Sequence, residues 1–352
     1  MRFPTYFPLF LLLLAAIGGQ SCRSTAHSVT VRLADKHRGA HVFGRLDSTN
    51  VDLLDPFHFT WLTLVPYASQ AEVSNATVEY FYGDSSYREQ RLAEWGERLE
   101  AAHLAGYRVL LKPHIWLRDP GPGRWRSDIY PADDADWQRW QASYRAFILD
   151  YAQLAAQHDV AGFCVGMELS QLTTKRPEFW RSLIREVRAI YSGQLTYAAN
   201  WYGEYDLITF WDALDFIGIQ AYFPLTNQAN PDTTELMMGW QKHLAAIQRV
   251  QATYERPVIF TELGYKSTSD AAIEPWTWLD FSDLDKHQES EATQADAYRA
   301  FFRAVWSQPW FGGVHLWQLR CDYAEQDAYW KRLDFTPQDK MAAEVIAKYF
   351  AN

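Results

Sequence analysis

The fold is most readily recognised from Val160-Ala-Gly-Phe-Cys-Val-Gly-Met-Glu168, an uncharged and largely apolar run that ends in a carboxylate. A short apolar run between longer amphipathic stretches is typical of a buried strand. Helical periodicity predicts one helix over residues 136–158, before the run, and another over residues 176–191, after it. The local unit is therefore a buried strand flanked by two helices.

The same unit recurs along the chain. Short apolar or β-branched runs predict eight strands, at residues 39–44, 60–66, 107–114, 160–168, 195–200, 214–222, 257–262 and 312–317. Helical patterns cover residues 88–105, 136–158, 176–191, 234–254, 293–307 and 337–350, with less regular stretches after the first and fifth strands. Eight strand–helix alternations predict an α/β fold, a single (β/α)8 TIM barrel over residues 39–352, with its longest loops after strands three and seven.

Composition and charge exclude several classes of protein. The 352 residues are 48% hydrophobic and 22% charged, a balance that excludes a disordered or coiled-coil chain. The net charge is −10 and no basic tract occurs, so nucleic acid is not an expected partner. The 16 tryptophans exceed what a core of this size needs, so some of them are expected to have another use.

The first residues have the order of an export signal. Arg2 precedes an apolar run at residues 9–17, and small residues lead from there to Cys22. This order predicts a signal peptide over residues 1–21, which is too short to span a membrane. Cys22 resembles the acylated cysteine of the bacterial lipobox, although Gly19 and Gln20 replace the usual aliphatic and small residues.

That resemblance implies that Cys22 is lipidated, and simple secretion with an incidental cysteine is the alternative. Residues 22–38 then form the lipidated cysteine and a polar tether. The expected location is the bacterial cell envelope, with membrane contact only through the lipid anchor, or otherwise the periplasm or the outside of the cell. The two remaining cysteines, Cys164 and Cys321, offer no obvious disulfide framework, so stability must come from core packing.

Polar and aromatic residues gather at the carboxyl ends of the predicted strands. They are His114, Glu168, Asn200, Trp201, Tyr222, Glu262 and Trp317. In a (β/α)8 barrel these ends surround one mouth, where active sites lie. Strand alternation also points Lys112, Gln220 and His315 inward. For the fourth strand it predicts that Gly166 points inward and Met167 toward the helices.

Glu168 and Glu262 would face each other across this mouth. Hydrolysis of a glycosidic bond requires such a pair, because one carboxyl protonates the leaving oxygen while the other, ionised, attacks or stabilises the anomeric carbon. For either glutamate alone, a helix cap or a salt bridge is the simpler interpretation. Both, however, end apolar strands, where a buried charge without a purpose would be costly. The pair therefore favours a glycosidase.

Several motifs, taken in order, resemble glycoside hydrolase family 113. They are Leu111-Lys-Pro-His114, Val165-Gly-Met-Glu168-Leu, Tyr197-Ala-Ala-Asn200-Trp201, Asp215-Phe-Ile-Gly-Ile-Gln-Ala-Tyr222-Phe-Pro and Thr261-Glu262-Leu-Gly-Tyr265. The resemblance runs from about residue 60 to residue 335. It implies a retaining (β/α)8 glycosidase that acts on β-1,4-mannan or its oligosaccharides.

Position by position, the resemblance implies that Glu168 is the acid/base and Glu262 the nucleophile. It also implies that Tyr222 hydrogen-bonds the nucleophile and that Trp317 forms the floor under the sugar being cleaved. The wider clan has Asn directly before the acid/base, where this chain has Met167. Asn200 is our candidate for the missing contact to the sugar 2-hydroxyl.

Residue type and position suggest further substrate contacts. Flat indole rings suit the apolar faces of sugars, and six tryptophans fall at strand ends or in the following loops: Trp116, Trp125, Trp201, Trp276, Trp278 and Trp317. Loop packing is the alternative for about half of them, and Trp201 and Trp317 are the strongest candidates.

Other inward or loop residues have two possible roles. His114 and Lys112 are candidates for contacts with sugar hydroxyls, but Lys112 would serve equally well as a buried partner for an acid. Gln220 and His315 lie deeper and are expected to support the site. Gln70 and Asp322 are weaker loop candidates.

No metal or cofactor site is predicted. The ten histidines are scattered without His-Glu-x-x-His spacing, and Gly121-Pro-Gly123 lacks the strand-to-helix context of a nucleotide loop. Cys164 lies in an apolar strand without a paired base, which predicts packing. Two alternatives remain open: the same chemistry on another β-linked glycan, such as glucan or xylan, and a non-catalytic surface glycan-binding lipoprotein.

Overall fold

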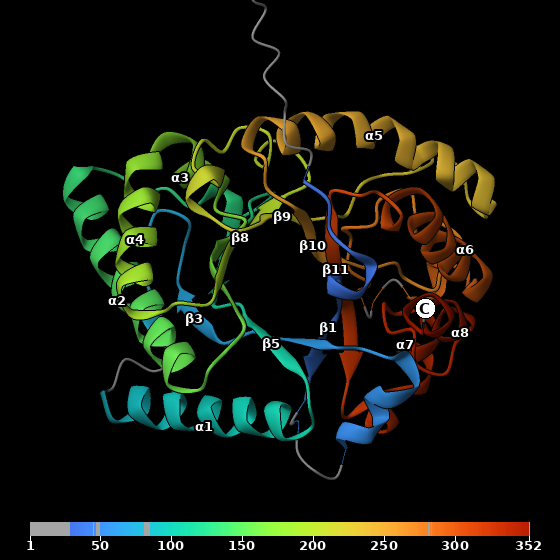
Figure 1. The fold of residues 1–352 in the computed structure, drawn as a ribbon, viewed down its shortest axis with the longest axis horizontal. Helices are drawn as coiled ribbons and strands as arrows, with labels where there is room; N and C mark the ends of the chain where they lie inside the picture. Colours follow the sequence, from blue (N-terminus) through green and yellow to red (C-terminus); the bar gives the residue numbers. More distant parts are fainter. Residues whose placement is uncertain are drawn as a thin grey trace, which may run out of the picture.

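The computed structural model describes residues 29–44, 46, 50–80, 85–280, 282 and 284–351. Eight parallel strands form a closed barrel at its centre (Figure 1). Around the barrel they are β1 (His37–Phe43), β2 (Trp61–Leu64), β5 (Arg108–Leu111), β7 (Gly162–Met167), β8 (Gln194–Asn200), β9 (Ile217–Gln220), β10 (Val258–Leu263) and β11 (Phe311–Arg320). The eight predicted strands and the TIM barrel are confirmed.

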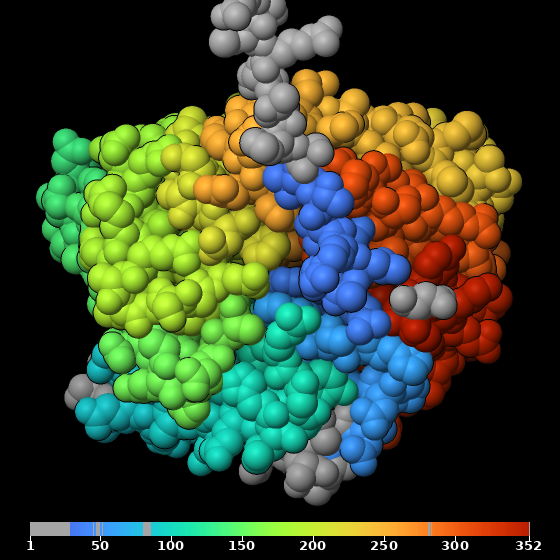
Figure 2. All heavy atoms as spheres, viewed as in Figure 1, coloured from blue at the N-terminus to red at the C-terminus, as the bar shows by residue number. Residues whose placement is uncertain are grey.

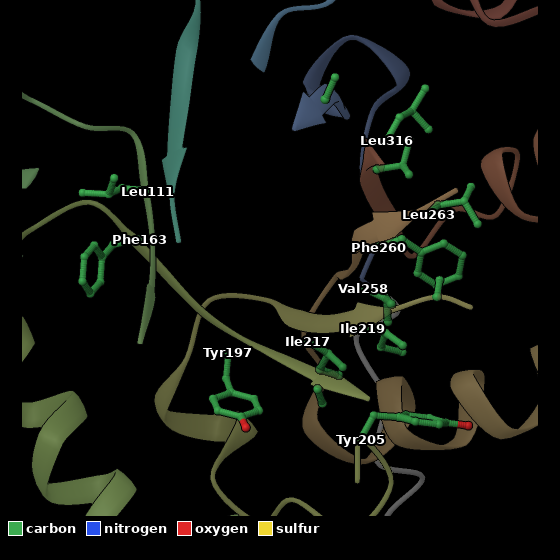
Figure 3. Packing of buried hydrophobic residues seen from close by; sticks show 14 of the residues in the cluster. Leu111, Phe163, Tyr197, Tyr205, Ile217, Ile219, Val258, Phe260, Leu263 and Leu316 are labelled. Carbon is green, nitrogen blue, oxygen red and sulfur yellow. The ribbon is translucent and has the colours of Figure 1, made fainter. Parts of the chain in front are cut away.

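Helices surround the barrel and cover its outer face (Figure 1). They are α1 (Ser85–Leu104), α2 (Asp134–Gln157), α3 (Ser170–Lys175), α4 (Pro177–Ile190), α5 (Thr233–Tyr254), α6 (Glu291–Phe301), α7 (Ala328–Leu333) and α8 (Met341–Phe350). The six predicted helices are confirmed, whereas the short α3 and α7 were not predicted. Figure 3 shows Leu111, Phe163 and Phe260 projecting away from the barrel axis, where they are fully buried in the layer under the helices.

Side-chain caps fix where three of the long helices begin. Asp133 accepts a hydrogen bond from the backbone of Asp136 at the start of α2, and Asp232 does the same for Glu235 in α5. Ser290 accepts from Thr293 at the start of α6. Each cap satisfies a backbone N–H that has no partner within its helix. The stretches after β1 and β8 instead hold the 3-10 turns η2 (Val51–Phe57) and η4 (Trp211–Ala213), as their irregular patterns predicted.

A second, three-stranded sheet lies beyond the ends of two barrel strands. It consists of β3 (Tyr67–Gln70), β4 (Glu79–Tyr80) and β6 (His114–Leu117), in the order β4-β3-β6. We predicted one strand over residues 107–114, but the barrel strand ends at Leu111 and His114 begins β6. Pro113 explains the break, because proline has no N–H to donate to a strand ladder.

The predicted alternation fails near the end of β7. A side chain on Gly166 would lie 2.5 Å from Tyr144 Oη and 2.8 Å from the Trp180 ring, so this position faces the helices. Met167 packs instead with Cys164 and Ala198 inside the barrel. The cause is a register shift between Cys164 and Met167 in the pairing of β7 with β8, since one extra residue reverses the facing of those that follow.

The segment before β1 packs against the amino-terminal face of the barrel, and its residues are blue in Figure 2. The backbone N–H of Val31 donates to Pro309 O at 2.7 Å, and the buried Lys36 ammonium donates to Gln308 O at 3.0 Å. Strand β1 begins at His37, so the barrel starts two residues before the predicted position. The predicted signal peptide and Cys22 lie outside the described residues. Within the described part of the chain, no helix has the length and apolar character needed to span a membrane.

Candidate active site

A cavity of about 1030 Å³ opens at the carboxyl ends of the barrel strands. Its walls combine two carboxylates with many aromatic rings and a few other polar groups. They include Phe43, Tyr67, His114, Trp116, Trp125, Arg126, Met167, Glu168, Asn200, Trp201, Tyr222, Glu262, Trp276, Trp278, Trp317, Arg320 and Trp330. The two predicted carboxylates therefore line the same cavity.

Glu262 lies in β10 and is held from two sides. The Lys112 ammonium lies 2.5 Å from Oε1, and the Tyr222 hydroxyl donates to Oε2 at 2.8 Å. Burial, and then the negative charge of Glu262, raise the pKa of Tyr222 well above its usual value, so the phenol remains protonated and can donate. Lys112 is fully buried beneath the carboxylate and does not line the cavity. Of the two roles considered for Lys112, the structure places it as a buried partner for an acid.

Glu168 directly follows β7 and has a left-handed backbone, with φ of 52°. Its backbone N–H donates to Ala198 O at 3.0 Å. Its carboxylate contacts a loop instead of the barrel floor: Arg126 Nη1 lies 2.7 Å and Trp125 Nε1 3.4 Å from Oε2. Arg126 lies in the loop beyond β6 and was not predicted, because no sequence pattern distinguishes it from other loop arginines.

Aromatic rings form most of the remaining wall. All six tryptophans predicted as sugar platforms line the cavity, together with Trp330, which was not predicted. Trp116 in β6 and the loop residues Trp125, Trp276 and Trp278 are between 40% and 51% exposed, which leaves ring surface free for a ligand. Trp201 stacks on Trp276 with ring centroids 5.1 Å apart. This stack joins the loop after β8 to the loop after β10.

Comparison with known proteins identifies the family. The model of Glycoside Hydrolase Family 113 matches residues 41–340. The chain belongs to this family. It is therefore a glycoside hydrolase. No curated protein matches the sequence significantly.

Solved structures of the family resemble this hydrolase in both sequence and fold. A GH113 β-1,4-mannanase is 26% identical with a TM-score of 0.75, and the match covers 90% of this chain and 99% of that chain. The GH113 β-mannanase AaManA from Alicyclobacillus acidocaldarius, in complex with ManMIm, is 25% identical with a TM-score of 0.74, covering 90% and 97%. A Ruminococcus gnavus β-glucuronidase, at 15% identity and a TM-score of 0.59, covers 90% of this chain and 50% of that chain and shares the fold alone.

In this family 113 hydrolase, Asn200 lines the cavity but its amide nitrogen is already bonded. It donates to Ser170 Oγ at 3.0 Å and to Glu204 Oε2 at 3.1 Å. Glu204 is fully buried and also accepts from Tyr197 Oη and Thr173 Oγ1. Glu204 was not predicted, because nothing in its position four residues beyond Asn200 indicates burial.

The Glu204 carboxyl is also unusual in its protonation. Burial raises its pKa to about 7, and hydrogen bonds from Asn200, Tyr197 and Thr173 only partly oppose this shift. The hydroxyl of Tyr197 also accepts the backbone N–H of Leu169 at 2.7 Å. Glu204 thus connects the backbone directly after Glu168 to the end of β8.

The remaining predicted residues lie at different depths. His114 lines the cavity, its imidazole is buried, and its Nδ1 has no hydrogen-bond partner among the described residues. Gln220 accepts from Thr261 Oγ1 at 3.0 Å, and His315 bonds Thr63 Oγ1 at 2.7 Å. Neither of these two reaches the cavity.

Gln70 and Asp322 do not line the cavity either. Gln70 accepts from Trp140 Nε1, and Asp322 pairs with Arg320. In the described part of the chain, no cluster of three His, Cys, Asp or Glu residues could hold a metal ion. Burial raises the pKa of the Cys164 thiol to about 11, so it remains a protonated packing residue at neutral pH.

We expect Glu204→Gln to change how stability depends on pH. The folded carboxyl, with a pKa of about 7 against an ordinary value of 4.5, binds its proton more tightly than the unfolded one. Native stability therefore falls as the pH rises through that window, by on the order of 1 kcal/mol per pH unit. Gln cannot ionise. The free energy of unfolding of the variant, measured in urea, should therefore rise relative to that of the native chain between pH 4.5 and pH 8. The exposed Glu178→Gln variant is the control, and identical pH dependence of Glu204→Gln and the native chain would contradict the assignment.

Proposed function

We propose that this hydrolase is a retaining β-mannanase that cleaves β-1,4-mannosidic linkages in mannan or manno-oligosaccharides by double displacement. The unequal surroundings of the two cavity carboxylates support the proposal most directly. Glu262 lies between the Lys112 ammonium and the Tyr222 hydroxyl, which stabilise the anion that a nucleophile must be. Glu168 contacts a loop and is assigned as the acid/base. Similarity to family 113 β-mannanases supports the choice of substrate.

The proposed reaction has two steps at one carbon. Glu168 gives its proton to the glycosidic oxygen while Glu262 attacks the anomeric carbon, so the bond to the leaving sugar breaks as the glycosyl ester forms. Water then attacks the same carbon and gives a proton to Glu168, and the ester bond to Glu262 breaks. Two inversions leave the anomeric configuration unchanged.

The other predicted residues would bind the sugar or orient the carboxylates. Trp317 provides an aromatic floor beside Tyr222, with which it packs. Trp201, Asn200 and His114 line the cavity and are assigned to substrate contact. Burial lowers the pKa of the His114 imidazole well below its usual value, so this residue lines the cavity as a neutral ring. Lys112 acts through Glu262.

We expect Glu168→Ala and Glu262→Ala each to lose roughly 10²–10⁴-fold or more of the activity on mannan, because each removes a group that changes its bonding in the transition state. Release of reducing ends from mannan, glucomannan, xylan and cellulose is the measurement. Glu274→Ala, an exposed glutamate in the loop after β10, is the matched control. Turnover only on glucan or xylan would mean that another β-linked glycan is the substrate. Glycan binding without turnover by the native chain would contradict the assignment as a mannanase.

The configuration of the first product tests the retaining course. Proton NMR during hydrolysis of a manno-oligosaccharide should show the β-anomer first, with the α-anomer appearing only through mutarotation. If the α-anomer is formed directly, Glu262 is not a nucleophile and a water molecule attacks the sugar instead.

We also propose export with anchoring through a lipidated Cys22, supported by the order of residues 1–22 alone. Lipidation should keep the protein in the membrane fraction of a bacterial host, and a Cys22→Ser variant should be released from it. Release of both forms would favour simple secretion.

A further inference from the structure

Two donors from one loop turn meet the same oxygen of Glu168. Arg126 Nη1 and Trp125 Nε1 lie 2.7 Å and 3.4 Å from Oε2. The guanidinium also lies over the Trp125 ring, 4.1 Å from its centroid, and the Arg126 side chain is 12% exposed. Among the described residues, no hydrogen bond reaches the other oxygen, Oε1. The guanidinium is thus held between an indole face and one defined side of the carboxylate.

The loop is built to hold this turn in place. Trp125 N donates to Asp128 Oδ2 at 2.8 Å, and Asp128 N donates back to Trp125 O at 2.9 Å, which closes the 3-10 turn η3 (Arg126–Asp128). Backbone hydrogen bonds from Asp119 to Ala71 and from Tyr130 to Val73 anchor the loop on either side. The position of Arg126 therefore follows from the fold of the loop.

Four other titratable groups act on Glu168 or share its surroundings. Burial raises the pKa of Tyr67 to about 12 and that of Tyr222 well above its usual value, so both phenols are neutral. Burial raises the pKa of the Glu204 carboxyl, below the end of β8, to about 7, and the Glu262 carboxylate, in β10, is paired with Lys112. Arg126 places a positive charge in direct contact with Glu168.

We propose that Arg126 is a positioning residue that sets the charge of Glu168 and selects the oxygen that carries its proton. The proposal rests on the proposed function, in which Glu168 is the acid/base. With Oε2 held by Arg126, Oε1 gives its proton to the glycosidic oxygen as the bond to the leaving sugar breaks. Arg126 then stabilises the carboxylate that remains, until Oε1 takes a proton from the attacking water.

The charge of Arg126 has a predictable effect on the pH profile. Without it, Glu168 holds its proton to higher pH, so the acid persists to higher pH and the base forms only at higher pH. For kcat/KM on manno-oligosaccharides, whose cleavage needs the acid, the alkaline limb of Arg126→Gln should move up by on the order of one pH unit. For kcat on 2,4-dinitrophenyl β-mannobioside, whose leaving group needs no acid, the acidic limb should move up as well.

Further variants separate charge from structure. Arg126→Met should show the same shifts as Arg126→Gln, and Arg126→Lys, which retains the charge, should keep both limbs near those of the native enzyme. Arg118→Gln removes one positive charge from the same loop, where Arg118 pairs with Glu79 away from the cavity, and should shift neither limb. If the neutral Arg126 variants lower the rate by the same factor at every pH, the proposal is overturned.

A parallel experiment keeps this result distinct from the proposed function. Glu168→Ala should be inactive on manno-oligosaccharides, and sodium azide should restore its turnover of the dinitrophenyl substrate by replacing the water that lacks a base. If Glu168→Ala retains native activity, the acid/base assignment itself fails. If Glu168→Ala behaves as expected and Arg126→Gln shows no shift, only the role of Arg126 fails.

Discussion

The buried contact between Lys112 and Glu262 is the constraint on which the site depends. Both side chains are almost completely removed from water, and desolvating two charges costs several kcal/mol for each ion. Such a pair is tolerable only when its geometry is close and its remaining groups are hydrogen-bonded. Tyr222 supplies one such bond to Glu262, and Gln220 Oε1 lies 3.5 Å from the ammonium. The contact therefore requires the closed barrel, which holds β5, β9 and β10 at fixed positions.

The residues below this pair add polarity without adding charge. His41 Nε2 lies 3.7 Å from Glu262 Oε1, and His315 lies deeper, bonded to Thr63. Burial, together with the positive charge of Lys112, lowers the pKa of both imidazoles well below the usual value, so they are neutral at physiological pH. Neutral neighbours leave the charge of Glu262 balanced by Lys112 and do not compete for it.

The sequence predicted what local patterns determine and missed what the path of the chain determines. Apolar runs predicted the strands, and strand ends predicted that Glu168 and Glu262 line one cavity. Alternation failed at Gly166 and Met167, because it assumes an unbroken ladder and the register shifts there. Arg126 was missed because its position depends on a separate small sheet, whose strand β6 starts where Pro113 ends the barrel pairing.

The two carboxylates differ in what holds them, and this difference corresponds to what the proposed reaction asks of each. The partners of Glu262 come from within or directly after barrel strands, and so its charge before attack is set by rigid elements. The cationic partner of Glu168 comes from a loop, on a side chain that reaches the cavity surface. A nucleophile must be ionised whenever substrate arrives, whereas an acid/base must lose and regain a proton in every cycle. A buried ammonium suits the first requirement because it stabilises one charge state strongly. A guanidinium at the cavity wall suits the second because it contacts Oε2, whereas among the described residues no hydrogen bond reaches Oε1, the oxygen that gives and takes the proton in the proposed reaction.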